Sequence, residues 1–93
     1  MEEIKQPVAD VSPEERVQRF EYMMLSRLES DCHFYLGHGN RDAEYALYYH
    51  NEKKHIREML KLWDELVVKP QWLSKEEIYE LAEKMGVKKD DVQ

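Results

Sequence analysis

Apolar side chains recur at spacings of three, four and seven residues through the first third of the chain, as one face of an α-helix requires. The centre of this stripe is formed by Val17, Phe20, Met24, Leu28 and Tyr35, and its edges by Met23, Leu25, Phe34 and Leu36. The preceding Ser12-Pro13-Glu14-Glu15 has the hydroxyl, proline and glutamate of a helix start with a capping box. We therefore expect a helix over 12–36 that ends at Gly37, a residue suited to a left-handed helix C-terminus.

Two further helical segments follow the glycine-rich turn at 37–40. Residues 43–49 indicate a short helix, and Asn51 is suited to cap the next one. That next segment, 52–67, has the clearest amphipathic pattern of the chain. Its apolar face is formed by Ile56, Met59, Leu60, Trp63, Leu66 and Val67. The pattern leaves open whether 43–49 and 52–67 form one bent helix or two separate ones.

A second capping box, in which Ser74 is the N-cap and Glu77 the N3 residue, predicts the start of the last helix. Its apolar positions are Ile78, Leu81, Ala82 and Met85, and it should stop at Gly86. No stretch alternates with the period of a strand. The sequence therefore predicts an all-α fold, a small bundle of three to four helices around a single core. This helical domain spans 12–86, between a flexible leader at 1–11 and a flexible tail at 87–93.

Composition narrows the class of protein. The 93 residues include 20 acidic and 14 basic side chains, for a net charge of −6. A nucleic-acid backbone is bound by clustered lysine and arginine, so we expect no direct contact with nucleic acid. The single cysteine, Cys32, cannot form an internal disulfide, which favours a reducing cytoplasm. No apolar run is long enough to cross a membrane, and we expect no membrane partner.

Asp31 is the most informative polar residue, because its helical angle places it inside the apolar stripe of the first helix. A carboxylate in that position needs hydrogen-bond donors. One interpretation is a general acid or base with a raised pKa. The other, which we favour, is an anchor for the turn that follows the helix, with donors from Asn40, Arg41 or the backbone of 37–42. The residues of this structural turn anchor are Asp31, Gly37, Gly39, Asn40 and Arg41.

The spacing of the candidate residues gives little support for a catalytic or metal site. Cys32, His33 and His38 are too few for a structural zinc site, and His50 and His55 are five apart, so they do not share a helix face. Cys32 is more typical of a small buried hydrophobe than of a nucleophile. The glycine-rich turn follows a helix and lacks the lysine of a phosphate-binding loop. We expect no catalytic residue, no metal, no cofactor and no enzymatic activity.

Two surface features point to a protein partner. Residues 1–49 carry ten acidic and five basic side chains, so the first half of the chain is the acidic half. An acidic surface attracts a basic partner, although a solvated face is its commoner meaning. Tyrosines cluster at 45–49, where they either form a contact surface or fill the core. The candidate partner surface comprises Glu14, Glu15, Glu21, Glu29, Tyr45, Tyr48 and Tyr49.

Three segments together resemble a known family. The stretch 27–41 contains Asp-Cys and Tyr-Leu-Gly-x-Gly-Asn-Arg elements, segment 52–63 follows, and 69–73 reads Lys-Pro-x-Trp-Leu. These resemble one of the large polyvalent protein-associated domains of phage, plasmid and other mobile-element proteins. The resemblance covers roughly residues 22–85. It departs from the family pattern over 43–50, where tyrosines stand in place of a shorter turn with tryptophan and glycine.

The resemblance implies a mobile-element origin and a helical module, and it transfers no catalytic residue. By analogy it suggests a non-enzymatic interaction module in the cytoplasm of the host cell that inhibits a host defence protein, of the anti-CRISPR or anti-restriction type. The alternative is a structural or regulatory module that associates with itself, so a homodimer is possible. A small enzyme or metal protein is a third hypothesis. It would require stoichiometric metal, or an activity that depends on Asp31 or His38.

Overall fold

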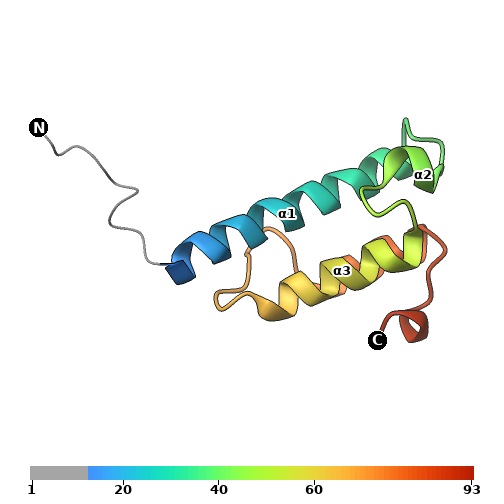
Figure 1. The fold of residues 1–93 in the computed structure, drawn as a ribbon. Coiled ribbons are helices and arrows are strands. Elements are labelled where there is room, and N and C mark those ends of the chain that lie inside the picture. The colour runs from blue at the N-terminus through green and yellow to red at the C-terminus, as the bar shows by residue number, and fades with distance from the viewer. Residues whose placement is uncertain (1–12) are drawn as a thin grey trace, which may run out of the picture.

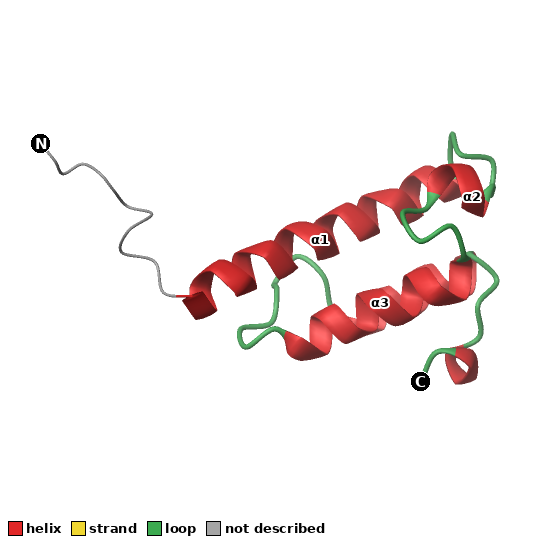
Figure 2. Cartoon of the chain, viewed as in Figure 1, coloured by secondary structure: helices red, strands yellow, loops and turns green. Residues whose placement is uncertain are grey.

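The computed structural model describes residues 13–93, and within that span it contains helices and loops but no strand (Figure 2). The predicted all-α fold is confirmed. Its elements are α1 (Pro13–Leu36), α2 (Ala43–Ala46), α3 (Glu52–Glu65), α4 (Lys75–Lys84) and the short 3₁₀ helix η3 (Lys89–Asp91). The predicted leader at 1–11 and the Ser12 cap lie outside the described residues.

Helix α3 is the centre of the bundle. It runs antiparallel to α1 on one side and packs against α4, which lies behind it in Figure 1, on the other. The fully buried side chains between these helices include Leu25, Leu28, Ile56, Met59 and Ile78. The two long connections close opposite ends of this arrangement: 37–51 at one end and 66–74 at the other (Figure 1).

The buried face of α1 differs from the predicted stripe. Leu25, which the periodicity placed at its edge, is completely buried, as is Cys32, whereas Val17 and Phe20 are 56% and 61% exposed. The reason is length. A helix of 24 residues spans about 36 Å and one of 14 residues about 21 Å, so the first third of α1 extends past the end of α3. Apolar residues in that overhang have no helix to pack against.

The predicted helix boundaries are confirmed where a cap defines them. Asn51 accepts a hydrogen bond from the Lys54 N–H at 2.9 Å and starts α3. Ser74 and Glu77 form both bonds of the predicted capping box. Gly86 ends α4 with a φ of +84°. Capping groups in the sequence therefore located these termini correctly.

The structure also decides the question left open over 43–67. Helix α2 stops at Ala46, and His50 adopts a φ of +60°, which no helix tolerates, so α2 and α3 are separate. The prediction was wrong at Val67, because α3 ends at Glu65 and leaves Val67 88% exposed.

Lys69 caps the C-terminal end of α3. Its ammonium group donates hydrogen bonds to the carbonyl oxygens of Trp63, Asp64 and Leu66, at 2.8, 2.9 and 2.8 Å, and lies 4.8 Å from the centre of the Trp63 ring. A cation at a helix C-terminus satisfies carbonyls that have no intrahelical partner and opposes the helix dipole.

Residues 87–93, expected to be a flexible tail, instead pack onto the bundle. Val87 and Val92 are only 4% and 6% exposed. Asp91 is held from α3, where Lys53 forms an ion pair with its carboxylate at 3.8 Å and Arg57 donates to its carbonyl at 3.3 Å. The segment has no helical periodicity of its own, and contacts such as these with distant residues hold it in place.

Candidate partner-binding surface

Asp31 binds the segment after α2 rather than the turn at 37–42. Its Oδ2 accepts a hydrogen bond from the Tyr48 N–H at 3.0 Å, and its Oδ1 lies 3.5 Å from Nε of Arg27. The side chain is 16% exposed. The predicted donors Asn40 and Arg41 were wrong, because α2 folds the chain back over α1 and brings 47–50 beside Asp31. The carboxylate therefore fixes the backbone that carries Tyr48.

The glycine-rich turn uses its residues differently from the prediction. Neither Gly37 nor Gly39 has a positive φ; Asn40 and Arg41 take the left-handed backbone, with φ of +55° and +59°. Gly39 is needed for close approach, since a Cβ at this position would lie 2.7 Å from the Ala46 Cβ and 2.8 Å from the Phe34 carbonyl oxygen. Asparagine tolerates left-handed backbone better than most residues with a side chain.

Arg41 joins this turn to the far helix. Its Nη2 donates to the carbonyl of Lys84, the last residue of α4, at 2.8 Å, and its guanidinium lies 6.0 Å from the centre of the Tyr35 ring. Tyr35 in turn donates to Oε2 of Glu52 at 2.7 Å, and burial together with that carboxylate raises the pKa of its hydroxyl. The turn thus connects α1, α3 and α4 and has a structural role.

An exposed group of aromatic side chains, which we call the aromatic ridge, comprises Phe34, Tyr45 and Tyr48. Tyr45 is 70% exposed and its ring packs 5.6 Å from that of Phe34. Tyr48 is 46% exposed, and the guanidinium of Arg27 lies 5.2 Å from its ring centre. Tyr49 is partly buried against the core, where its ring lies 5.0 Å edge-on from that of Tyr48 and 6.0 Å from that of His55. Of the three predicted tyrosines, two face solvent and one does not.

The predicted acidic residues do not join the aromatic ridge. Glu14, Glu15 and Glu21 lie at the opposite end of α1, where 20 residues separate Glu14 from Phe34, or about 30 Å of helix. Glu29 faces the α4 side and lies 3.8 Å from Nε2 of His33. The structure therefore separates the predicted partner surface into the aromatic ridge, the acidic start of α1 and Glu29 on the α4 side.

Cys32 has the environment of a packing residue. It is completely buried, and its Sγ lies 3.6 Å from Sδ of Met59. Burial first, and then the carboxylates of Asp31 and Glu29, raise the pKa of its thiol to about 12. A thiol needs its thiolate form to act as a nucleophile. This environment favours the interpretation of Cys32 as a buried hydrophobe.

His55 is a buried polar residue that the sequence interpretation missed. It is fully buried, and its Nε2 lies 2.9 Å from the carbonyl oxygen of Leu28. A carbonyl only accepts, so Nε2 carries the proton, and Nδ1 has no partner among residues 13–93. Burial lowers the pKa of the ring and keeps it neutral. The signal was present, since His55 and Met59 are four apart on the apolar face.

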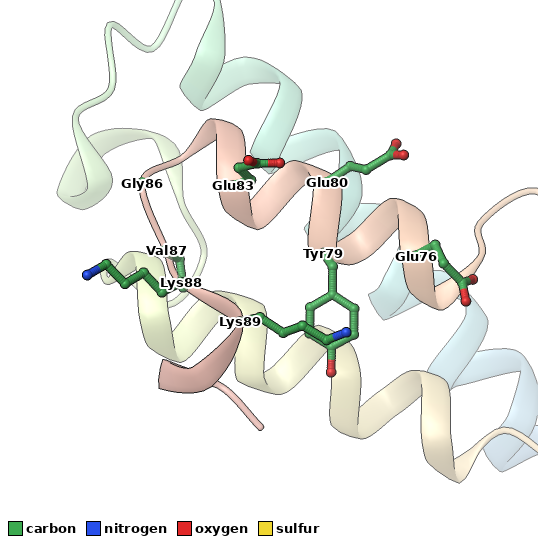
Figure 3. A pocket seen from close by; sticks show the side chains of 8 residues that line it. All are labelled: Glu76, Tyr79, Glu80, Glu83, Gly86, Val87, Lys88 and Lys89. Atoms are coloured by element: carbon green, nitrogen blue, oxygen red, sulfur yellow. The ribbon is translucent and has the colours of Figure 1, made fainter.

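No group of three or more potential metal ligands gathers within residues 13–93. A hollow of about 630 Å³ lies between α4 and the segment that follows it. In Figure 3 the side chain of Lys89 crosses the Tyr79 ring, with its ammonium 4.7 Å from the ring centre, while Glu80 points outward. The chain's own cation thus covers the aromatic face that a planar ligand would use.

A comparison with protein families identifies the family of this chain. The family model of large polyvalent protein-associated domain 11 matches residues 18–85, which include both end connections of the bundle. The chain belongs to this family. The predicted resemblance is confirmed, and the domain is a module associated with the polyvalent proteins of phage and mobile elements. No curated protein and no solved structure matches the chain. Among the helices of residues 13–93, none is long and apolar enough to cross a membrane.

Proposed function

We propose that this domain is a non-enzymatic protein-interaction module that binds a host defence protein, of the restriction or CRISPR type, and inhibits it. The observation that carries the proposal is the aromatic ridge. It exposes Tyr45 and Tyr48 to solvent on a surface that the bundle itself does not use. Membership in a family of phage and mobile-element proteins supports the choice of a host protein as the target.

The aromatic ridge is ordered before any partner arrives. The Tyr48 backbone is held by Asp31, its ring by Arg27, and the Tyr45 ring rests on Phe34. Tyrosine presents a large contact area with few rotatable bonds, so little side-chain entropy is lost when it is fixed at an interface. Tyrosine and arginine are also the residue types enriched among binding hot spots.

The buried groups support a role without catalysis. A thiol with a pKa of about 12 and a neutral histidine inside the core are both shielded from any substrate. Asp31 is already occupied by Arg27 and by the Tyr48 N–H. Cys32, His55 and Asp31 are therefore committed to holding the fold.

The test is a plating assay. The chain is expressed in bacteria that carry one restriction or CRISPR system at a time, and the plating efficiency of a targeted phage is measured. We expect plating to recover with at least one system, and the double variant Tyr45→Ser/Tyr48→Ser to lose that effect. Met23→Ser is the matched control, because Met23 is 70% exposed but lies outside the ridge.

A different result would assign the domain to the alternative function. If no system is affected, and sedimentation velocity shows a dimer that the same double variant dissociates, the ridge serves self-association. That outcome would leave the fold and the family assignment unchanged, and it would overturn the proposal that the domain binds a host defence protein.

A further inference from the structure

A second exposed apolar surface lies at the other end of α1. We call it the acidic groove, a hollow of about 330 Å³ between the start of α1 and the end of α3. Its lining residues are Pro13, Glu14, Val17, Gln18, Glu21, Glu65 and Val67. Val17 and Val67 supply its apolar part, and they are 56% and 88% exposed. The groove exists because α1 extends past α3.

The loop that displays Val67 is held in place. Oε1 of Gln18 accepts hydrogen bonds from the N–H groups of Val67 and Val68, at 3.0 and 3.3 Å. The hydroxyl of Tyr22 donates to the Val68 carbonyl. With its backbone groups bonded to α1, the loop keeps the Val67 side chain directed away from the core. The side of the groove formed by Val67 is thus held in place by α1.

The rim of the groove carries uncompensated negative charge. Within residues 13–93, no cation forms an ion pair with Glu14, Glu21 or Glu65. The pKa of Glu21 is raised, first by burial, then by the charge of the neighbouring Glu65 carboxylate and by a hydrogen bond to that side chain. Two carboxylates held close together repel each other, and a cation placed between them would relieve that repulsion.

We propose that the acidic groove binds a short basic amphipathic segment of a protein partner. An apolar side chain of that segment packs between Val17 and Val67, and a lysine or arginine lies between the carboxylates of Glu21 and Glu65. The site is separate from the aromatic ridge, at the far end of α1. It goes beyond the proposed function, because it requires neither a defence protein nor inhibition.

Charge decides between this occupant and the two that the chain itself could supply. A second copy docked through the same surface would place the rim glutamates of both copies against each other, since a twofold interface is self-complementary. The segment 1–12 contains three acidic residues and one lysine, so its charge also repels the rim. A basic partner is the occupant whose charge complements the groove.

The experiment measures binding of a defined probe by fluorescence anisotropy. The probe is a labelled peptide of roughly 14 residues, four helical turns, built from leucine and lysine at helical spacing. Its twin has glutamate in place of every lysine. We expect the full chain to bind the lysine peptide at low ionic strength and not its twin. Glu21→Gln/Glu65→Gln should weaken binding about tenfold, a change of about 1.4 kcal/mol.

Two further variants separate a specific groove from general attraction to an acidic protein. Glu80→Gln/Glu83→Gln makes the same charge change on exposed positions of α4 and should leave binding unchanged within about twofold. Val67→Ser should weaken binding through lost apolar contact, and its exposure means that the fold is retained, which circular dichroism verifies.

Four outcomes overturn the proposal. They are absence of binding, equal weakening by the α4 variant, a dimer that Val67→Ser dissociates, and peptide binding that begins only when residues 1–12 are deleted. The third assigns the groove to a second copy, and the fourth to the chain's own first residues. None of them bears on the plating assay, so this site and the proposed function fail independently.

Discussion

The guanidinium of Arg41 and the backbone carbonyl of Lys84 are 2.8 Å apart, although 43 residues separate them in the chain. Lys69 makes the equivalent contact at the other end of the bundle, where it caps α3. Each connection thus places a cation on the C-terminus of a helix, where free carbonyls and the helix dipole favour it. The Tyr-Leu-Gly-x-Gly-Asn-Arg and Lys-Pro-x-Trp-Leu elements therefore supply contacts that hold the two ends of the bundle together.

Replacing Arg41 with alanine should destabilise the domain. The change removes the hydrogen bond to the Lys84 carbonyl, and for an exposed charged donor we expect a loss of about 1 kcal/mol in the free energy of unfolding. Urea denaturation measures it. Arg19→Ala is the control, since Arg19 is exposed on α1 and should change stability by less than about 0.5 kcal/mol. Equal losses of stability in the two variants would show that the Arg41 contact does not stabilise the bundle.

The two glycines of the turn should respond differently to alanine. At Gly39 the added methyl group meets Ala46 and the Phe34 carbonyl below 3 Å, so Gly39→Ala should cost about 2–3 kcal/mol. At Gly37 the nearest atom, the His33 carbonyl oxygen, is 3.3 Å away, and the cost should be much smaller. Thermal unfolding of the two variants compares them directly. A Gly37 variant as unstable as the Gly39 variant would contradict the packing argument.

Asp31 should matter for stability more as a hydrogen-bond acceptor than as a charge. Asp31→Ala removes the acceptor of the Tyr48 N–H and should lower the free energy of unfolding by about 1–2 kcal/mol. Asp31→Asn keeps an oxygen at that site and loses only the exposed pair with Arg27, so a smaller loss is expected. Denaturant titrations of both variants give the order. No loss in either variant would refute the anchor role.

His55 should make the domain sensitive to mild acid. Its folded pKa is lowered, because burial outweighs the opposing effects of the Leu28 carbonyl and the Asp31 carboxylate. The unfolded chain therefore binds a proton more readily than the folded one once the pH falls below the ordinary value of 6.5. The contribution of neutral His55 to the free energy of unfolding is fully present above that pH. It declines below that pH, with a slope of at most about 1.4 kcal/mol per pH unit.

The measurement is the free energy of unfolding between pH 7.5 and about 5, for the wild type and for His55→Asn. The difference between the two proteins should shrink as the pH falls, because asparagine does not titrate. His38→Gln, at an exposed position of the turn, should leave the wild-type slope unchanged. A His55 variant with the full wild-type slope would assign the acid sensitivity to carboxyl groups.

Local chemistry made most of the helices predictable. Asn51, the Ser74–Glu77 pair and Gly86 act on the few residues beside them, so their effect can be derived from a short window of sequence. Periodicity found the buried face of α3 for the same reason. In each of these cases the interacting residues are close in the sequence, and no other helix is needed to define the helix end or its buried face.

The errors came from contacts between distant residues. Phe20 belongs to a regular apolar stripe, yet it is exposed because α3 is shorter than α1. Val92 has no pattern around it, yet it is buried by the packing of the last segment on the bundle. Asp31 was identified as an anchor, but its partner depends on where α2 turns the chain. The acidic groove was missed because Val17 and Val67 were both assigned to the core.

The overhang of α1 also sets how the domain moves. Its first turns share few contacts with the rest of the bundle, so their amides exchange with solvent through local fraying, at a lower free energy than global unfolding. The amides of 28–35, packed against α3, exchange only through larger openings. A ligand in the acidic groove must hold the frayed end in its helical form. Slowed deuterium uptake confined to the start of α1 is therefore a signature of occupancy, even for a partner whose identity is unknown.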